Sequence, residues 1–283
     1  MQKVSIVIPV YNESESIADT IHEIKEIFDG QLLYLPEIIV VNDGSVDDTI
    51  HQVSSTHPEV MIVNNVLNMG YGYSLKRGIE HATNDTIIIL DGDGSYPVHQ
   101  LNKMLDRYFQ GLDLVVGARN DFFVEDSFFK SMFRWLLKLI VEFTAGTKIP
   151  DVNSGMRIFS KSTIMPYFPY LSNKFSFTTS MTLHFALDSM KVEFIPNGYR
   201  KRKGQSKVSI YKDSIRTLQF IIEIIAIKNP LKLHLMVMTP SFILLLFSIV
   251  YWIKGFGIIP FALLTSTLLI QLSIAALGLN KMR

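Results

Sequence analysis

The chain has 283 residues, enough for one large domain or two modest ones, and 48% of them are hydrophobic, a high share for a purely soluble enzyme. It contains no cysteine, which excludes disulfides, thiolate catalysis and cysteine metal sites. The formal net charge of +1 hides a local excess of positive charge, because seven basic residues and one acidic residue lie between Arg200 and Arg216.

Short apolar runs rich in β-branched residues alternate with helical patterns in the first part of the chain. Strands that are apolar at consecutive positions are buried on both faces, and their alternation with helices predicts an α/β fold with a mostly parallel sheet. The predicted strands are Val4–Ile8, Ile38–Val41, Val60–Val63, Ile87–Leu90 and Leu114–Val116. The predicted helices are Ser14–Phe28, Asp47–Ser55, Gly70–Ala82 and Val98–Tyr108.

Polar loops follow three of these strands, at residues 9–13, 42–45 and 91–94. In such a sheet, ligands bind beyond the carboxyl ends of the strands, so we expect the three loops to meet at one edge. Taken singly, each loop could be no more than a turn, since Asp-Gly pairs are common turn formers.

Two of the loop carboxylates, Asp91 and Asp93, lie one residue apart in the sequence DGDG. Together with Asp43 they would repel one another unless their pKa values were raised or a cation lay among them. A calcium loop is excluded, because its sixth and twelfth positions hold Tyr96 and Asn102 instead of Gly and Glu. Oxygen ligands without His or Cys favour Mg²⁺ or Mn²⁺.

Two later segments have the pattern of helices that lie on a membrane surface. In residues 128–143 the cations Lys130, Arg134 and Lys138 form one stripe, and aromatic and aliphatic residues fill the remainder. A helix packed on the core with a solvated face would show the same periodicity. Residues 215–227 leave the same two alternatives open.

The last part of the chain has two long segments without Asp, Glu, Lys or Arg, which predict transmembrane helices at about 233–253 and 258–279. Lys228 and Lys232 precede the first segment and Lys281 and Arg283 follow the second, so the positive-inside bias places both ends in the cytoplasm. Two buried helices of a soluble core are the alternative. The predicted organisation is a cytoplasmic domain over 1–208, a juxtamembrane amphipathic helix over 209–231 and a transmembrane hairpin over 232–283.

Several motifs resemble those of a known family. The segments IVIPVYNE, VNDGSVDDT, NMGYGYSLKRGI and LDGDGSYP are similar to the sugar-nucleotide-binding signatures of family 2 glycosyltransferases, which have the Rossmann-like GT-A fold. The later segments VVGARND, DVNSGMRIF and GYRKRKGQSKVS resemble polyprenyl-phosphate glycosyltransferases of the dolichol-phosphate mannose synthase type. The resemblance covers roughly the whole chain.

The resemblance implies roles for particular residues. The UDP- or GDP-sugar would be held by Pro9, Tyr11, Glu13, Val41, Asp43, Asp91, Gly92 and Asp93, with Arg202 and Lys207 covering its diphosphate. The metal ligands would be Asp91, Asp93 and Ser95, although some relatives have Gln where this chain has Ser95. The acceptor phosphate would meet Arg119, Ser154 and Arg157, and the residues placed in catalysis are Asp91, Asp93 and Arg119.

The implied reaction transfers one hexose to undecaprenyl or dolichyl phosphate at the cytoplasmic membrane face, with inversion of configuration. Relatives that glycosylate hydroxyl groups place an acidic base at the start of a helix, where this chain has Thr178, Thr179 and Ser180. A phosphomonoester needs no such base, because it is largely ionised at neutral pH. Transfer to a lipid or glycan hydroxyl, and a non-catalytic membrane-anchored protein that binds nucleotide sugars, remain the alternatives. No nucleic-acid partner is expected, and a homo-oligomer is left open.

Overall fold

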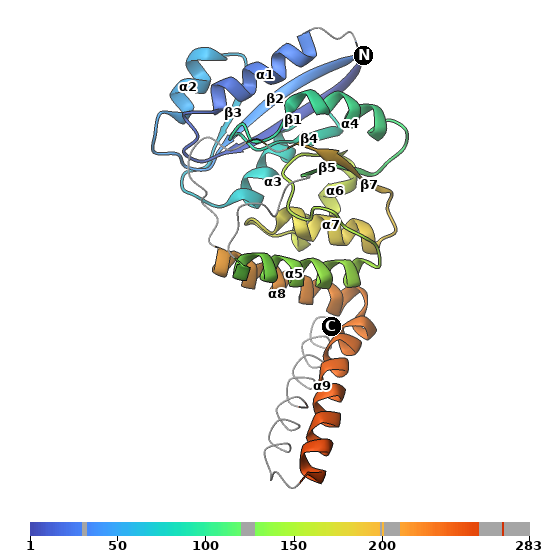
Figure 1. Ribbon diagram of the computed structural model, residues 1–283. Helices are drawn as coiled ribbons and strands as arrows, with labels where there is room; N and C mark the ends of the chain where they lie inside the picture. Colours follow the sequence, from blue (N-terminus) through green and yellow to red (C-terminus); the bar gives the residue numbers. More distant parts are fainter. Residues whose placement is uncertain (30–32, 120–127, 199, 201–209, 255–267, 269–283) are drawn as a thin grey trace. The chain divides into compact units, whose positions relative to one another are not determined.

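The computed structural model describes residues 1–29, 33–119, 128–198, 200, 210–254 and 268 (Figure 1). The chain divides into two compact units, Met1–Leu218 and Gln219–Arg283. The first unit contains all the strands found in the described residues.

The strands form one sheet in the order β3-β2-β1-β4-β6-β5-β7. All its pairs are parallel except those of β6, which runs antiparallel to both β4 and β5. The strands are β1 (Gln2–Val10), β2 (Tyr34–Asn42), β3 (Met61–Asn64), β4 (Thr86–Ile89), β5 (Leu114–Arg119), β6 (Arg157–Ser160) and β7 (Val192–Asn197). The five predicted strands and the mostly parallel sheet are confirmed, whereas β6 and β7 were not predicted.

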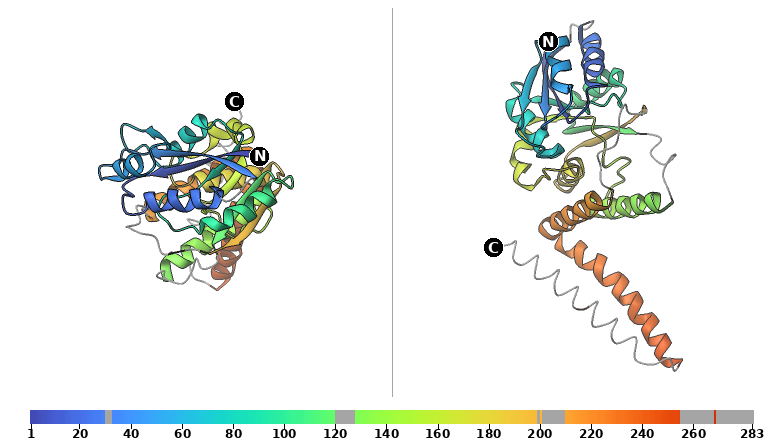
Figure 2. Two further views of the ribbon diagram at one scale, coloured as in Figure 1. Left: turned by 90° about the horizontal axis from the view of Figure 1, so that it is seen from above. Right: turned by 90° about the vertical axis from the view of Figure 1, so that its left-hand side faces the viewer.

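Helices cover both faces of this sheet (Figures 1 and 2). The helices of the first unit are α1 (Ile17–Asp29), α2 (Thr49–Thr56), α3 (Tyr71–His81), α4 (Leu101–Tyr108), α5 (Phe128–Ala145), α6 (Lys161–Ile164) and α7 (Phe177–Leu187), with short 3₁₀ turns at Val98–Gln100 and Met165–Tyr170. Two further helices follow, α8 (Ile210–Lys228) and α9 (Pro230–Ile253). All four helices predicted for the first part of the chain are confirmed.

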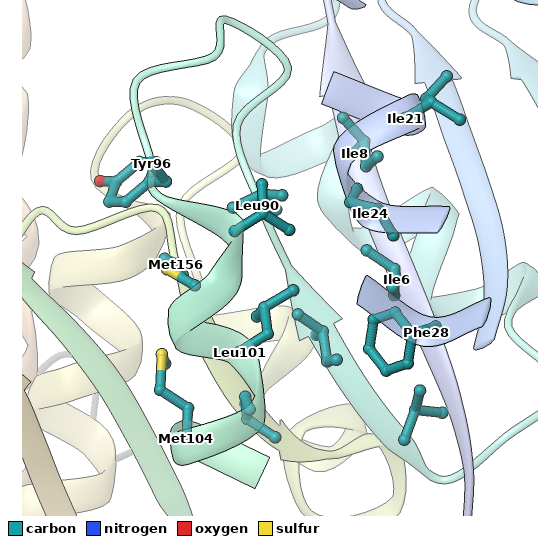
Figure 3. Packing of buried hydrophobic residues seen from close by; sticks show 14 of the residues in the cluster. Ile6, Ile8, Ile21, Ile24, Phe28, Leu90, Tyr96, Leu101, Met104 and Met156 are labelled. Carbon is teal, nitrogen blue, oxygen red and sulfur yellow. The ribbon is translucent and has the colours of Figure 1, made fainter. Parts of the chain in front are cut away.

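Two apolar clusters lie on the two faces of the sheet, because successive side chains of a strand point to opposite sides. In β1, Ile6 and Ile8 join the cluster under α1 and α4, while Val7 joins the cluster under α3 and α7. Figure 3 shows the first of these clusters, with Ile21 and Ile24 of α1 packed toward β1. Each such fully buried side chain contributes about 1.5–3 kcal/mol to folding. The sheet that carries the loops at its carboxyl edge is therefore packed on both faces.

The two segments with the pattern of membrane-surface helices, residues 128–143 and 215–227, are helical in the structure. Helix α5 packs against α7 and exposes Trp135, Leu136, Leu139 and Phe143, while Lys138 lies 3.9 Å from Glu142. The side chains of Lys130 and Arg134 lie outside the part of the chain that the structure describes. Helix α8 contains the predicted segment 215–227.

None of the helices formed by the described residues is both long and apolar enough to cross a membrane. The predicted span at 233–253, which lies within α9, is therefore not supported by the structure. The predicted span at 258–279 lies outside the described residues, with the exception of Leu268.

Candidate active site

Three loops meet at the carboxyl edge of the sheet. The loop after β1 is joined to the loop after β2, because the Asn12 amide donates to the Ser45 hydroxyl at 3.0 Å and the Val46 amide donates to Asn12 Oδ1 at 2.9 Å. The loop after β4 is joined to the first loop by the Ser16 hydroxyl, which donates to the Gly92 carbonyl at 2.9 Å. The expectation that these loops converge is confirmed.

The carboxylates of Asp91 and Asp93 lie in the loop after β4. Asp91 is half-buried, and its Oδ1 accepts a hydrogen bond of 2.9 Å from the Tyr71 hydroxyl. Asp93 is 3% exposed and accepts hydrogen bonds from the Ser95 amide, at 3.0 Å, and from the Ser95 hydroxyl. Ser95 is fully buried, and its two hydrogen bonds orient the Asp93 carboxylate. Its contact with the metal stays a prediction.

The residues at this edge fit a divalent cation. Among the described residues there is no cluster of three or more His, Cys, Asp or Glu side chains, so two carboxylates are what the loop itself offers to a metal. That set suits Mg²⁺ or Mn²⁺, which commonly take one or two protein carboxylates and complete the shell with phosphate oxygens and water. Burial and the charge of Asp91 raise the pKa of Tyr71 well above its usual range, so its phenol remains a hydrogen-bond donor at neutral pH.

Asp43 was predicted to contact the nucleotide. Its side chain is 4% exposed and accepts hydrogen bonds from the loop before α3. Its oxygens accept hydrogen bonds from the Asn65 side chain at 2.9 Å and from the amides of Met69 and Gly70 at 2.8 and 2.9 Å. The side chain of Val41 is fully buried in the core, so its predicted contact with the nucleotide does not fit as a side-chain contact.

Three other residues assigned to the nucleotide lie at the end of β1 or just after it. Pro9, Tyr11 and Glu13 are all half-buried. The Glu13 amide donates to the Thr49 hydroxyl at 2.8 Å, and the Glu13 carbonyl accepts from the amide of Ile17 at the start of α1. The structure thus places all three at the same edge as Asp91 and Asp93.

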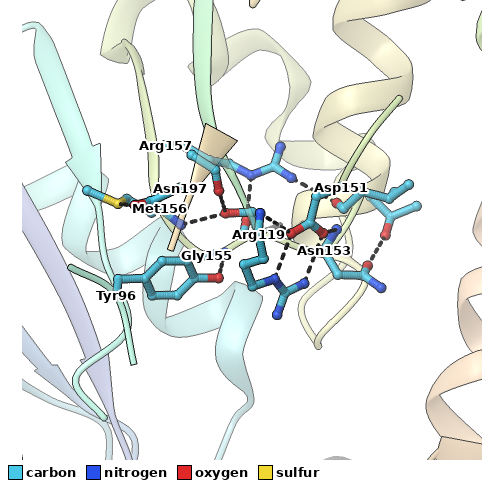
Figure 4. Close-up of polar contacts among 12 residues, drawn as sticks. Tyr96, Arg119, Asp151, Asn153, Gly155, Met156, Arg157 and Asn197 are labelled. Atoms are coloured by element: carbon cyan, nitrogen blue, oxygen red, sulfur yellow. Dashed lines mark hydrogen bonds and ion pairs between the residues drawn. The ribbon is translucent and has the colours of Figure 1, made fainter. Parts of the chain in front are cut away.

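Arg119, at the end of β5, forms a buried ion pair with Asp151 (Figure 4). Its Nε and one terminal nitrogen donate to the two carboxylate oxygens at 2.6 and 2.9 Å, and the two side chains are 10% and 5% exposed. Burial alone would raise the pKa of Asp151, but the hydrogen bonds and charge of Arg119 lower it below its usual value. An acceptor phosphate at Arg119 would therefore share this guanidinium with Asp151.

Ser154 and Arg157 were also assigned to the acceptor phosphate. Both are fully buried and form hydrogen bonds to groups inside the protein. The Ser154 hydroxyl donates to the Gly117 carbonyl at 2.6 Å. The Arg157 guanidinium donates to the carbonyls of Ser154 and Val152, both at 2.8 Å, and to the Thr182 hydroxyl at 2.7 Å (Figure 4). The structure does not fit the predicted phosphate contacts of these two side chains, because both are buried and already donate hydrogen bonds to acceptors inside the protein. Burial lowers the pKa of Arg157 to about 10.

Residues 5–168, more than half of the chain, match the family described as glycosyl transferase family 2. The chain belongs to glycosyl transferase family 2. It is 30% identical over 257 residues to the putative glycosyltransferase CsbB of Bacillus subtilis (strain 168), an alignment that covers 89% of this chain and 74% of the relative. It is also 30% identical over 197 residues to the undecaprenyl-phosphate 4-deoxy-4-formamido-L-arabinose transferase of Pseudomonas fluorescens (strain SBW25). That alignment covers 65% of this chain and 57% of the relative, so the chain spans little more than half of that protein.

Solved structures of one enzyme share the fold. The glucosyl-3-phosphoglycerate synthase of Mycobacterium tuberculosis in complex with phosphoglyceric acid superposes with a TM-score of 0.64 at 16% identity, over 79% of this chain and 80% of the other. Its complex with Mn²⁺, UDP-glucose and phosphoglyceric acid superposes with a TM-score of 0.62 at 17% identity, over 79% of each chain. At these identities the likeness shows the fold alone, and it confirms the GT-A fold expected for this family 2 member.

The start of α7 in this family 2 chain carries buried hydroxyl groups. The Thr179 hydroxyl donates to Asn153 Oδ1 at 2.8 Å, and the Ser180 hydroxyl donates to the carbonyls of Ser176 and Phe177, both at 2.9 Å. The first turn of α7 contains no acidic residue. The Thr179 hydroxyl thus joins α7 to the loop that follows Asp151, whereas the Ser180 hydroxyl bonds within the first turn of α7, and neither side chain supplies a carboxylate base.

Other site residues were missed or cannot be placed. Arg202 and Lys207 lie outside the described residues. Tyr71 and Gly155 were not singled out, although both lie in motifs of the family 2 resemblance. Asp151 was missed as the partner of Arg119. The sequence shows each residue type but not the contact, because the partners are 20 to 64 positions apart: Tyr71 with Asp91, Arg119 with Asp151, and Gly155 with Asp91.

The Arg119–Asp151 pair predicts how stability depends on pH. A carboxylate with a lowered pKa stabilises the folded state above its unfolded pKa of about 4, and this contribution is lost as pH falls through the folded pKa. We expect Asp151→Asn to be less stable than the wild type at pH 7, with the difference shrinking below about pH 4. Urea unfolding at pH 7, 5 and 3 measures this, and a constant difference would contradict it.

Proposed function

We propose that this chain is an inverting glycosyltransferase that moves one hexose from a UDP- or GDP-sugar to a polyprenyl phosphate. The observation that carries the proposal is the convergence of three loops on Asp91 and Asp93 at the carboxyl edge of the sheet, in a member of glycosyl transferase family 2. This edge is where open α/β sheets bind their ligands.

The donor would lie across the loops after β1, β2 and β4. Asp91 and Asp93 would hold a Mg²⁺ or Mn²⁺ ion, which would neutralise charge on the departing diphosphate. Ser95 keeps the Asp93 carboxylate oriented, and Asp43 keeps the loop before α3 closed. Pro9, Tyr11 and Glu13 border the same edge, where the base and ribose would bind. These groups are in place before the donor binds, so little reorganisation is needed during the reaction.

The reaction would be a single displacement at the anomeric carbon. An oxygen of the lipid phosphate forms a new bond to the anomeric carbon. At the same time the bond between the anomeric carbon and the diphosphate oxygen of the donor breaks, and its electrons leave with the UDP or GDP. The lipid phosphate is largely ionised at neutral pH and needs no base to remove a proton. The absence of an acidic residue from the first turn of α7 supports such an acceptor. Arg119 would stabilise the acceptor phosphate by its positive charge.

Two further observations support a lipid acceptor. The Pseudomonas fluorescens relative is described as an undecaprenyl-phosphate transferase. Helix α5 exposes Trp135, Leu136, Leu139 and Phe143, side chains suited to the boundary between lipid headgroups and acyl chains. We propose that the uncharged runs at 233–253 and 258–279 anchor the chain in a membrane, with the catalytic unit on the cytoplasmic side.

The test is to incubate the purified chain with UDP- and GDP-hexoses, Mn²⁺ or Mg²⁺, and either undecaprenyl phosphate or undecaprenol. We expect one donor to give a glycosylated lipid phosphate, and we expect a chelator to abolish the product, because the two carboxylates need a cation to hold the diphosphate. Transfer to undecaprenol at the same rate would favour a hydroxyl acceptor. Transfer that persists in excess chelator would contradict the role given to the metal.

A further inference from the structure

Tyr71 is the first residue of α3 and contacts the loop that carries Asp91. No contact between α3 and this loop was predicted from the sequence. The Tyr71 hydroxyl donates to Asp91 Oδ1 at 2.9 Å. An ionised carboxylate offers about four lone-pair positions to hydrogen-bond donors or cations. The Tyr71 hydrogen bond uses one of them, and a carboxylate can accept a hydrogen bond and bind a cation at the same time, so the two functions are compatible.

Tyr71 is itself held in a defined position. Its ring stacks on the ring of Phe175, with centroids 5.8 Å apart and an interplanar angle of 16°. The preceding residue, Gly70, has a φ of +111° that favours glycine, and its amide donates to Asp43 Oδ2 at 2.9 Å. A Cβ atom on Gly72 would lie 2.1 Å from the Ser172 carbonyl oxygen, so the start of α3 is pressed against the segment before α7. The phenol therefore has little freedom to move away from Asp91.

Gly155 makes a second close approach to the same carboxylate. A Cβ atom at this position would lie 2.4 Å from both carboxylate oxygens of Asp91, closer than real Cβ contacts come. The Gly155 amide donates to the Tyr96 hydroxyl at 2.7 Å, and Tyr96 is 2% exposed (Figure 4). The backbone at Gly155 is thus fixed where it limits the orientations open to Asp91.

We propose that Tyr71 is a positioning residue, whose hydroxyl holds the Asp91 carboxylate against Gly155 in the orientation that binds the divalent cation of the donor complex. The inference rests on the proposed function, because it assigns Asp91 to that cation. It also gives Asp43 a role at a distance, since Asp43 fixes Gly70 and so the start of α3.

The test is Tyr71→Phe, which removes the hydroxyl and keeps the ring that stacks on Phe175. The matched control is Tyr73→Phe on the same helix, because the Tyr73 hydroxyl has no hydrogen bond to any of the residues that the structure describes. Mn²⁺ binding in the presence of UDP is measured directly, from the electron paramagnetic resonance signal of free Mn²⁺, beside thermal unfolding and the dependence of transfer on Mn²⁺.

For Tyr71→Phe we expect the dissociation constant for Mn²⁺ to rise about 10- to 100-fold, the range found when a partner that orients a metal ligand is removed. The Mn²⁺ concentration needed for half-maximal transfer should rise in parallel, and saturating Mn²⁺ should restore most of kcat. Tyr73→Phe should match the wild type in each measurement.

Equal Mn²⁺ affinity in Tyr71→Phe and in the wild type would overturn the inference, and so would a loss of thermal stability without a change in Mn²⁺ affinity. If the wild type bound no Mn²⁺ with UDP, or if Asp91→Asn bound it as tightly as the wild type, the inference and the metal role in the proposed function would fall together. If the wild type bound Mn²⁺, Asp91→Asn lost this binding and Tyr71→Phe kept it, the inference about Tyr71 would be refuted and the proposed function would stand.

Discussion

Replacing Asp91 or Asp93 with asparagine is expected to lower kcat by about 10³-fold, because a catalytic cation stabilises the transition state by several kcal/mol. Asparagine keeps an oxygen that can accept from Tyr71 at position 91 or from Ser95 at position 93, so the fold should persist. The measurement is the initial rate of transfer at saturating donor and lipid phosphate, with circular dichroism to verify folding.

Asp106 offers a matched control for this result. It lies on α4 and accepts a hydrogen bond from the Tyr34 hydroxyl at 2.9 Å, the same kind of contact and length as that between Tyr71 and Asp91. Asp106→Asn should leave kcat unchanged, since it lies away from the three converging loops. Rates of Asp91→Asn and Asp93→Asn within a factor of about two of the wild type would refute the assignment of these carboxylates.

Replacing Arg157 with methionine is expected to destabilise the first unit by about 3 kcal/mol, because the carbonyls of Val152 and Ser154 and the Thr182 hydroxyl each lose a buried donor. For a unit of this size the loss corresponds to a fall in Tm of about 6–12 °C. Thermal unfolding followed by circular dichroism provides the measurement, and the KM for lipid phosphate tests the alternative role in acceptor binding.

Arg107→Met is the control for Arg157→Met. Arg107 likewise donates hydrogen bonds, here to the carboxylate of Glu193 at 2.7 Å, but its side chain is 43% exposed, and exposed ion pairs contribute little to stability. We expect a much smaller fall in Tm for this variant. An unchanged Tm in Arg157→Met together with a raised KM for lipid phosphate would show that Arg157 binds the acceptor after all.

The sequence predicts most of the sheet because five strands are runs of apolar residues that repeat between helices. Strand β6 has no such signal: it begins with Arg157, ends with Ser160 and has only two apolar residues between them, and it is antiparallel to its neighbours. Strand β7 contains Glu193 and Pro196 and lies at the end of the sheet, where proline is tolerated but the apolar pattern is weak. Both strands depend on tertiary contacts that a local pattern does not contain.

The same difference explains which site residues were predicted. Asp43, Asp91 and Asp93 directly follow apolar strands, so the sheet rule alone brings them to one edge. The role of Tyr71 depends on how α3 is positioned, and that of Asp151 depends on which loop lies beside the end of β5. The predicted phosphate contacts of Ser154 and Arg157 do not fit their burial. A motif shows that a polar residue is present, but it does not show whether the side chain faces a ligand or a buried carbonyl.

The central claim is that Asp91 and Asp93 coordinate a divalent cation that holds the diphosphate of the donor. The most direct test is a crystal structure of the chain with Mn²⁺ and UDP, with data collected at the manganese absorption edge. The account predicts one anomalous peak in direct contact with carboxylate oxygens of Asp91 and Asp93 and with the diphosphate. UDP bound at this edge without an anomalous peak beside the two carboxylates would contradict it.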